Sequence, residues 1–269
     1  MPSESLYRLP LYYDIAFSWD PAHEVAVISD CLAPLRDARD ADGLRLLEPG
    51  CGTGRLLTAM AMHGHALVGY DKSEAMVAFA RRRIEATGLA DRVRVAVGEM
   101  IGPPDLGEGF DAAFCPINSL AHLVDDAAII SHLQHTAAAL RAGGLYSVQL
   151  AAMWEPALGH APAHWTISRD GLSVEICWTI ESEDPDARLS HQRCRMTIDD
   201  AGRRIEHDQP LTMRLWTDAD WRRLVGASGV FELAGVRDDA GAPLDIAAPV
   251  TADAGNAWWV LRKPTQVEP

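Results

Sequence analysis

Short apolar runs alternate with longer helical patterns through the middle of the chain. The apolar runs cover residues 44–47, 66–70, 93–97, 110–115 and 145–150. Three of the stretches between them have the apolar spacing or the end signals of helices, at 55–63, 73–88 and 125–140. Because parallel strands are joined by crossover helices, this alternation predicts βαβ units and an α/β fold built on a Rossmann-like sheet.

A helix is predicted before the first apolar run, over residues 20–38. Asp20 can cap its N-terminus and Pro21 suits its first position. Apolar residues then recur on one face, at Val25, Ile28, Leu32 and Leu35. We expect residues 1–43 to form a lid segment and a helix in front of a sheet core over residues 44–151.

The pattern changes after residue 151, where the βα alternation stops. Residues 172–181, 188–199 and 203–216 alternate as antiparallel strands do, and Asp-Pro-Asp and Asp-Ala-Gly turns separate them. This predicts a small antiparallel β insertion after the fifth strand, over residues 152–216. Over residues 217–269 we expect a helix that starts at Thr217, and strands at 230–236 and 257–261 that complete the main sheet.

The charge balance limits the partners that the surface can attract. The chain has 24 Lys plus Arg against 38 Asp plus Glu in 269 residues, a formal net charge of −14. A surface of this sign repels phosphate backbones and anionic lipid. We therefore expect neither nucleic acid nor a membrane as partner.

The cysteines and the N-terminal residues indicate the compartment. The five cysteines are widely spaced and include no C-x-x-C pair, which fits neither a disulfide framework nor a structural zinc site. Residues 1–10 lack the apolar run of a signal peptide, and no stretch approaches the length of a membrane-spanning helix. We expect free thiols and a cytoplasmic protein.

A glycine-rich loop with the sequence EPGCGTG, residues 48–54, joins the first strand to the next helix. Its alternate glycines let the backbone approach a ligand where a Cβ would collide. A dinucleotide fingerprint, G-x-G-x-x-G, would need glycine where Arg55 or Leu57 stands. The spacing therefore argues against a dinucleotide and leaves another nucleotide-like ligand.

The loop resembles the acidic-x-Gly-x-Gly-x-Gly motif of class I S-adenosylmethionine-dependent methyltransferases. The resemblance implies that family's sheet, with helices on both faces, and S-adenosyl-L-methionine as cofactor, with S-adenosyl-L-homocysteine as product and no metal. It also implies cofactor contacts from the loop, at Glu48, Gly50, Cys51 and Gly52.

Two further segments resemble the family's motifs in the expected order. Asp71 ends the second strand, where a carboxylate can accept hydrogen bonds from both ribose hydroxyls, and Lys72 and Met76 follow it in the same motif. Glu99 takes the position of the acid that binds the adenine amine, and Met100 lies against the ring. A strand-end cap at Asp71 and a surface turn at Glu99 are the structural alternatives.

The fourth strand ends in the run CPINSLAHL, residues 115–123, and ligands of open α/β sheets bind beyond such carboxyl ends. Asn118 and His122 are the catalytic candidates, because His122 is the side chain of this run that can take up a proton near neutral pH. A satisfied structural histidine is the alternative. The remaining predicted contacts from this run are Cys115 and Ile117 to the cofactor and Ser119 to the substrate.

The N-terminal segment, the Ser-Leu-Ala-His-Leu run and the β insertion resemble small-molecule N-methyltransferases, in particular those that dimethylate amino sugars of bacterial antibiotics. In that group, N-terminal tyrosines close over the cofactor, so Tyr13 and Trp19 are predicted cofactor residues. The β region, with Trp154, Trp165, Trp178 and Trp216, is expected to form a roof or wall of the acceptor pocket, and Tyr12 and Trp154 are the predicted substrate contacts. Core packing is the alternative for any one tryptophan. The chain departs from the group where Cys-Pro-Ile-Asn replaces a serine-rich run, so the acceptor stays open.

The predicted function is transfer of a methyl group in line from S-adenosylmethionine to a small molecule of secondary metabolism. An amine is the expected acceptor. O- or C-methylation of a small-molecule scaffold and a catalytically silent cofactor-binding protein are the alternatives. Related enzymes are often dimers, so a homodimer is expected.

Overall fold

The computed structural model describes residues 6–36, 43–155 and 161–265. A seven-stranded sheet has the order β10-β11-β5-β4-β1-β2-β3. Its parallel strands are β1 (Arg45–Pro49), β2 (Ala66–Asp71), β3 (Val93–Val97), β4 (Phe110–Cys115) and β5 (Leu140–Gln149), and β10 (Glu232–Arg237) and β11 (Trp258–Arg262) add an antiparallel edge. The predicted α/β sheet is confirmed, including the return of the last two strands to it.

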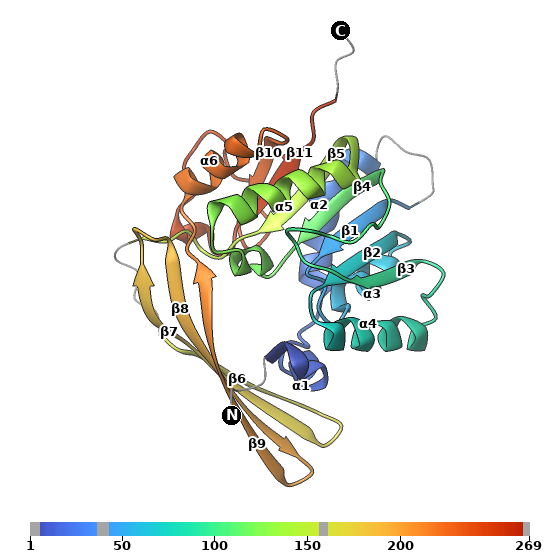
Figure 1. Cartoon of the computed structure of the whole chain (residues 1–269), viewed down its shortest axis with the longest axis vertical. Helices are drawn as coiled ribbons and strands as arrows, with labels where there is room; N and C mark the ends of the chain where they lie inside the picture. The colour runs from blue at the N-terminus through green and yellow to red at the C-terminus, as the bar shows by residue number, and fades with distance from the viewer. Residues whose placement is uncertain (1–5, 37–42, 156–160, 266–269) are drawn as a thin grey trace.

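Helices cover both faces of this sheet (Figure 1). Adjacent residues of β1 show the division, because Leu46 packs into one apolar core and Leu47 into the other. The core around Leu46 includes residues of α2 (Ala22–Arg36) and α3 (Arg55–Met62), and the core around Leu47 includes residues of α5 (Asp126–Ala139) and α6 (Asp218–Ser228). Burial on both faces explains why the inner strands β1, β2 and β4 contain continuous apolar runs, whereas the edge strand β3 is only partly buried.

Side-chain caps start the helices close to the predicted residues. Ser73 accepts a hydrogen bond from the Met76 N–H at the start of α4 (Glu74–Ala86), and Thr217 accepts one from the Asp220 N–H at the start of α6. Asp20 accepts one from the Ala22 N–H before α2, and the last two residues of that predicted helix, 37 and 38, lie outside the described residues.

A separate antiparallel sheet follows the fifth strand of the main sheet. Its strands, in the order β6-β7-β8-β9, are β6 (Ala163–Arg169), β7 (Leu172–Asp184), β8 (Leu189–Asp200) and β9 (Arg203–Arg214). The last three confirm the predicted strands, whereas β6 was not predicted. Val174, Cys194 and Ile198 are buried on the face that joins the main core.

The N-terminal segment folds as a short 3-10 helix, η1 (Leu6–Arg8), and an α-helix, α1 (Pro10–Ala16), where the sequence predicted only a lid segment. Helix α1 contacts α4, β6 and β7. Figure 1 shows it between α4 and the antiparallel sheet. This position brings the N-terminal aromatic residues over the carboxyl edge of the main sheet.

An ion-pair network fixes the antiparallel sheet to the main core. Arg214 at the end of β9 is buried, and its Nη2 lies 2.7 Å from Asp126 of α5 and also pairs with Asp220 of α6. Arg223 pairs with the same two carboxylates. A buried charge is stable only when it is paired in this way, so the network sets the sheet's position over the core.

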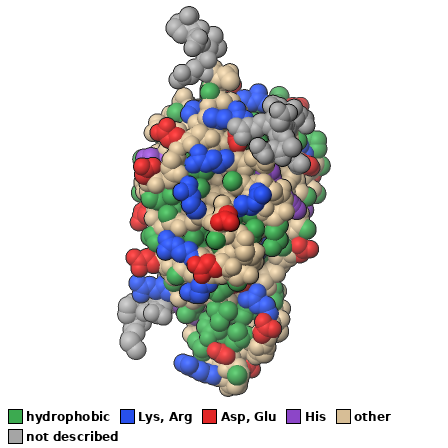
Figure 2. All heavy atoms as spheres, turned by 90° about the vertical axis from the view of Figure 1, so that its right-hand side faces the viewer, with side chains coloured by type: hydrophobic (Ala, Val, Ile, Leu, Met, Phe, Trp, Pro, Cys, Tyr) green, Lys and Arg blue, Asp and Glu red, His purple; other side chains and the backbone are tan. Residues whose placement is uncertain are grey.

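The outer surface mixes the two signs of charge. Figure 2 shows acidic and basic side chains interspersed on one face, with apolar side chains gathered toward its lower end, where the hairpins of the antiparallel sheet lie. Within the described ranges, no helix combines the length and the apolar character needed to cross a membrane.

Candidate active site

A cavity of about 810 Å³ opens at the carboxyl edge of the parallel strands. Its lining comes from the N-terminal segment, the loops after β1, β2, β3 and β4, and the antiparallel sheet. In open α/β sheets this edge is where ligands bind. The volume lies in the upper part of the range for small-molecule pockets, which is room for two small ligands.

The glycine-rich loop presents bare backbone to this cavity. Gly50 and Gly52 have φ angles of +67° and +52°, a left-handed conformation that favours glycine. A Cβ added to Gly50 would meet the Met100 Cε at 2.7 Å, whereas one added to Gly52 would meet nothing within 4 Å. Because both glycines line the cavity, the open space at Gly52 is a cradle in which a ligand can contact the main chain.

Glu48 is a buried carboxylate that lacks a complete set of partners. Its side chain ends β1, the residue is 4% exposed, and Oε2 has no hydrogen-bond partner among the described residues. Burial raises the pKa of Glu48 well above its usual value, and the Arg55 guanidinium opposes that rise. An orphaned carboxyl oxygen beside a cavity can accept hydrogen bonds from a cationic group of a ligand.

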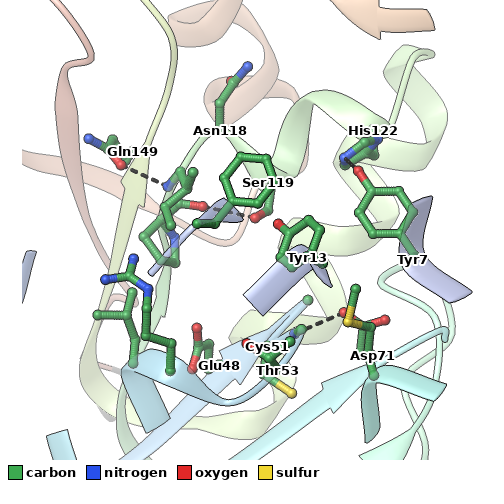
Figure 3. Close-up of a pocket in the computed structure, with 18 of the residues that line it drawn as sticks. Tyr7, Tyr13, Glu48, Cys51, Thr53, Asp71, Asn118, Ser119, His122 and Gln149 are labelled. Carbon is green, nitrogen blue, oxygen red and sulfur yellow. Dashed lines mark hydrogen bonds between the residues drawn. The ribbon is translucent and has the colours of Figure 1, made fainter. Parts of the chain in front are cut away.

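Asp71 ends β2 and ties the loop to the next helix. Its Oδ2 accepts a hydrogen bond from the Gly52 N–H at 3.0 Å, and its Oδ1 accepts one from the Ser73 N–H at 2.8 Å. Burial raises the pKa of Asp71, and these two N–H groups oppose the rise. Each carboxylate oxygen keeps a further lone pair for a ligand, and Figure 3 shows Asp71 at the floor of the cavity.

The turn after β3 carries the next predicted contacts, Glu99 and Met100. The Gly102 N–H donates to the Glu99 carbonyl at 3.3 Å, which closes the turn. Both residues line the cavity, and Met100 approaches Gly50 of the glycine-rich loop. The turn therefore extends the ligand surface from Asp71 along the sheet edge.

The loop after β4 is held in a strained conformation. Ile117 and Asn118 have φ angles of +55° and +53°, which is unusual for a β-branched residue such as Ile117. Gln149 Oε1 accepts the Ile117 N–H at 2.7 Å, and Asn118 Oδ1 accepts the Ala151 N–H at 3.1 Å and the Trp216 Nε1–H at 2.9 Å. These bonds commit the Asn118 oxygen to the loop, so Asn118 serves here as a support of loop geometry.

His122 lies opposite Tyr7, a cavity residue that the sequence did not single out. The His122 Nε2 and the Tyr7 hydroxyl are 2.9 Å apart. Burial, together with the nearby Lys72 ammonium, lowers the pKa of His122 to about 4. The imidazole is therefore neutral near pH 7 and is a weak base, so the geometry favours a hydrogen-bonding and orienting role.

Aromatic side chains form a wall on the other side of the cavity. The ring centroids of Tyr13 and Phe17 are 4.4 Å apart, and those of Phe17 and Trp165 are 5.7 Å apart. Trp165 Nε1 donates to the Ala16 carbonyl at 2.8 Å, which joins β6 to α1. Trp19 is 39% exposed at this side. Offset aromatic contacts of this kind build a rigid apolar surface for a ligand.

Most of the predicted site residues line the cavity, and three do not. Tyr12 donates its hydroxyl hydrogen to Asp200, Trp154 donates its indole hydrogen to Glu183, and Cys115 is fully buried below the cavity. Ligand contacts predicted for these three have no support in this geometry. The other predicted residues in the lining are Tyr13, Trp19, Glu48, Gly50, Cys51, Gly52, Asp71, Lys72, Met76, Glu99, Met100, Ile117, Asn118, Ser119 and His122.

Several lining residues reach the cavity from distant elements. Trp165 and Trp178, from β6 and β7, belong to the β region that the sequence predicted as a wall of the pocket, whereas Gln149 at the end of β5 and Tyr7 of η1 were missed. The sequence carried a signal for β6, because the pair Asp170 and Gly171 follows an alternating run and is typical of a hairpin turn. In the structure both residues have the positive φ angles of such a turn, which joins β6 to β7. Tyr7 had no comparable signal.

The charges of the lining are mostly negative. Its carboxylates are Asp14, Asp20, Glu24, Glu48, Asp71 and Glu99, against Arg55 and Lys72, which is six acids to two permanent cations. Glu24 pairs with Arg55, and Asp14 pairs with Arg83 and Arg169, so the net negative charge that a ligand meets is smaller than this count. Among the described residues, no group of three or more His, Cys, Asp or Glu side chains is placed to hold a metal ion.

Comparisons with known proteins agree with this geometry. Residues 46–144 match a family described as a methyltransferase domain. Ubiquinone biosynthesis O-methyltransferases from Paramagnetospirillum magneticum and Marinobacter nauticus are 33% and 31% identical over 108 and 132 residues. These matches cover 40% and 47% of this chain and 41% and 53% of the relatives, so the chain spans about half or less of their length.

Solved structures resemble the whole chain. The sugar N-methyltransferase KedS8 from Streptoalloteichus aligns with a TM-score of 0.74 at 21% identity, over 99% of this chain and 95% of that one. The amino pentose methyltransferase CalS10 from Micromonospora echinaspora, solved with S-adenosylmethionine bound, aligns with a TM-score of 0.70 at 23% identity, over 93% and 96%. At these identities the likeness shows a common fold, including the antiparallel sheet.

Proposed function

Since this chain contains a methyltransferase domain and has the fold of class I S-adenosylmethionine-dependent methyltransferases, we propose that it methylates an amine of a small molecule. The observation that carries the proposal is the two-ended cavity. One end consists of loops at the sheet edge with an orphaned carboxyl oxygen and a bare glycine, and the other is an aromatic wall.

The residues at the sheet edge fit S-adenosylmethionine. Glu48 would accept hydrogen bonds from the amino group of the cofactor's methionine moiety. The loop at Gly52 would contact the rest of that moiety. Asp71 would hold the ribose hydroxyls, and Glu99 and Met100 the adenine. A buried carboxyl oxygen with no partner and a Cβ-sized space at Gly52 support this fit.

The cofactor's sulfonium supplies an electrophilic methyl group, so the protein mainly aligns the acceptor and excludes water. The nitrogen lone pair forms a bond to the methyl carbon while the carbon–sulfur bond breaks and leaves its electron pair on sulfur. His122 and Tyr7 would orient the acceptor by hydrogen bonds. Because the neutral His122 is a weak base, an amine that binds as a cation would lose a proton to water before transfer, since only the neutral amine has the lone pair that attacks the methyl group.

An amine suits the acceptor end better than a neutral scaffold does. Most amines are cations near pH 7, and the acceptor end presents the faces of Tyr13, Phe17 and Trp165. Aromatic faces attract cations. Membership of secondary metabolism, a cytoplasmic location and a homodimer remain predictions from the sequence.

Methyl transfer can be tested with the purified chain, S-adenosylmethionine and matched libraries of amines and phenols. We expect mass spectrometry to find methylated products among the amines, with S-adenosylhomocysteine formed in equal amount. O-methylation is the second candidate, because the curated relatives matched over the cofactor half are O-methyltransferases. Products only among the phenols would favour it, and tight cofactor binding without any product would contradict both candidates.

A further inference from the structure

A buried histidine supports the turn after β3 from the side opposite the cavity. His132 of α5 is 0% exposed, and both of its ring nitrogens have partners. Nδ1 lies 3.1 Å from the Met100 carbonyl oxygen, and Nε2 lies 2.6 Å from the Tyr146 hydroxyl. The residue does not line the cavity, although Met100 does. His132 therefore contacts the ligand surface only through the main chain of Met100.

The partners fix the tautomer of this ring. The Met100 carbonyl can only accept a hydrogen bond, so Nδ1 of His132 carries the hydrogen and donates it. Nε2 is then the acceptor for the Tyr146 O–H. Burial lowers the pKa of His132 to about 4, and the hydrogen bond to Met100 opposes this shift only partly. The ring is neutral near pH 7, with Nδ1 as the donor to Met100 and Nε2 as the acceptor from Tyr146, and the Thr136 hydroxyl also lies 3.5 Å from Nε2.

The turn itself has few other anchors on α5. Among the described residues, the other hydrogen bond from this helix to the turn is the weak one that the Ser131 hydroxyl donates to the Ile101 carbonyl at 3.5 Å. On its cavity side, Met100 approaches Gly50 so closely that a Cβ there would collide with its Cε. A shift of the Met100 main chain would therefore disturb both Glu99 and the glycine-rich loop.

We propose that His132 is a positioning residue, which sets the cofactor-binding turn by donating a hydrogen bond from Nδ1 to the Met100 carbonyl. This rests on the proposed function, because it assumes that the turn binds the adenosine part of S-adenosylmethionine. The role of Nε2 and Tyr146 is to hold the ring in the orientation that this donation needs. The two halves of the network are separable by substitution.

Three variants separate the roles. His132→Asn keeps an amide donor at the place of Nδ1 and loses the contact with Tyr146. His132→Gln places its amide at Nε2, keeps the contact with Tyr146 and loses the donor to Met100. Tyr146→Phe removes the hydroxyl and leaves the donor in place. All three should lower the melting temperature, because each leaves a buried polar group without its partner.

Titration calorimetry with S-adenosylhomocysteine distinguishes positioning from a merely structural role. We expect His132→Gln to bind about tenfold more weakly, and His132→Asn and Tyr146→Phe to stay within about threefold of wild type. The loss in His132→Gln should persist for 5′-methylthioadenosine, which has the adenosine part and lacks the amino acid. Hydrogen exchange of the amides at 98–102 should be faster in His132→Gln alone.

Other outcomes overturn the inference. Wild-type affinity in His132→Gln, or equal losses of affinity in all three variants in step with their melting temperatures, would show that His132 only fills the core. If wild-type protein binds neither ligand, the proposed function fails and the inference with it. If His132→Gln does not fold, faster exchange at 98–102 in His132→Asn than in Tyr146→Phe contradicts the proposal, and protection equal to wild type supports it.

Discussion

The two ends of the cavity are built in different ways. At the cofactor end, each residue lies at or just beyond the carboxyl end of a parallel strand, as Glu48, Asp71 and Glu99 do, and the ligand surface is largely main chain. At the acceptor end, side chains from η1, α1, the loop after β4 and the antiparallel sheet meet, with Trp165 reaching the Ala16 carbonyl across the chain. The first end is set by local sequence and the second by tertiary packing.

This difference predicts which changes affect which ligand. A substitution at the sheet edge should weaken the binding of the cofactor and leave the protein's contacts with the acceptor in place. A substitution in the aromatic wall should act on the acceptor alone.

The largest effect is expected at Asp71. Asp71→Ala removes the predicted pair of ribose contacts and the bond to the Gly52 N–H. The free energy of cofactor binding should become less favourable by roughly 2–4 kcal/mol, which is the contribution of a pair of charge-assisted hydrogen bonds. Calorimetry with S-adenosylhomocysteine measures it. Asp71→Asn, which keeps one acceptor oxygen, should lose less, and unchanged affinity in Asp71→Ala would remove the ribose assignment.

A smaller effect on a different quantity is expected at His122. His122→Asn removes the partner of the Tyr7 hydroxyl, so turnover should fall roughly ten- to a hundredfold through loss of alignment. Cofactor affinity should change by less than about twofold, because His122 belongs to the acceptor end. Steady-state kinetics at several pH values give the turnover. An unaltered rate at every pH would show that His122 is structural.

Two tryptophans provide a matched pair at the acceptor end. Trp165→Ala opens the aromatic wall, and the KM for the acceptor should rise about tenfold, in line with the loss of an aromatic contact. Trp154→Ala makes the same change at a residue outside the cavity, and the KM should stay close to wild type. Equal effects from both variants would mean that the wall does not contact the acceptor.

The smallest effect concerns acid stability. The folded pKa of His122 is lowered to about 4 from an ordinary value of 6.5. Between these values the unfolded chain binds more protons, so stability falls as pH decreases from 6.5 toward 4. His122→Asn should reduce this decline of the melting temperature by about 2–4 °C. A melting temperature with the same pH dependence in both proteins would contradict the depressed pKa.

Prediction from the sequence succeeded where structure is local. The glycine-rich loop, the strand-end position of Asp71 and the caps at Ser73 and Thr217 depend on residues within a few positions of each other. Their chemistry is visible in the order of the residues. The inner strands of the parallel sheet could also be predicted, because burial on both faces leaves a continuous apolar run in the sequence.

The acceptor end could not be predicted in this way. Tyr7 reaches His122 from more than a hundred positions away, and no pattern in either segment indicates the contact. Trp154 stood next to the fifth strand, which favoured it as a substrate contact, but its indole hydrogen is bound by Glu183 of β7. Strand β5 begins at Leu140 instead of Leu145, because a bulge against β4 accommodates Gly143 and Gly144 inside the strand.

The arrangement of the two ends is tested most directly by a crystal structure with S-adenosylhomocysteine bound. We expect its amino group to lie within hydrogen-bond distance of Glu48, its ribose to lie against Asp71, and its sulfur to face the space between His122 and Trp165. A ligand bound with its sulfur turned away from that space, or with Glu48 still lacking a partner, would contradict the account.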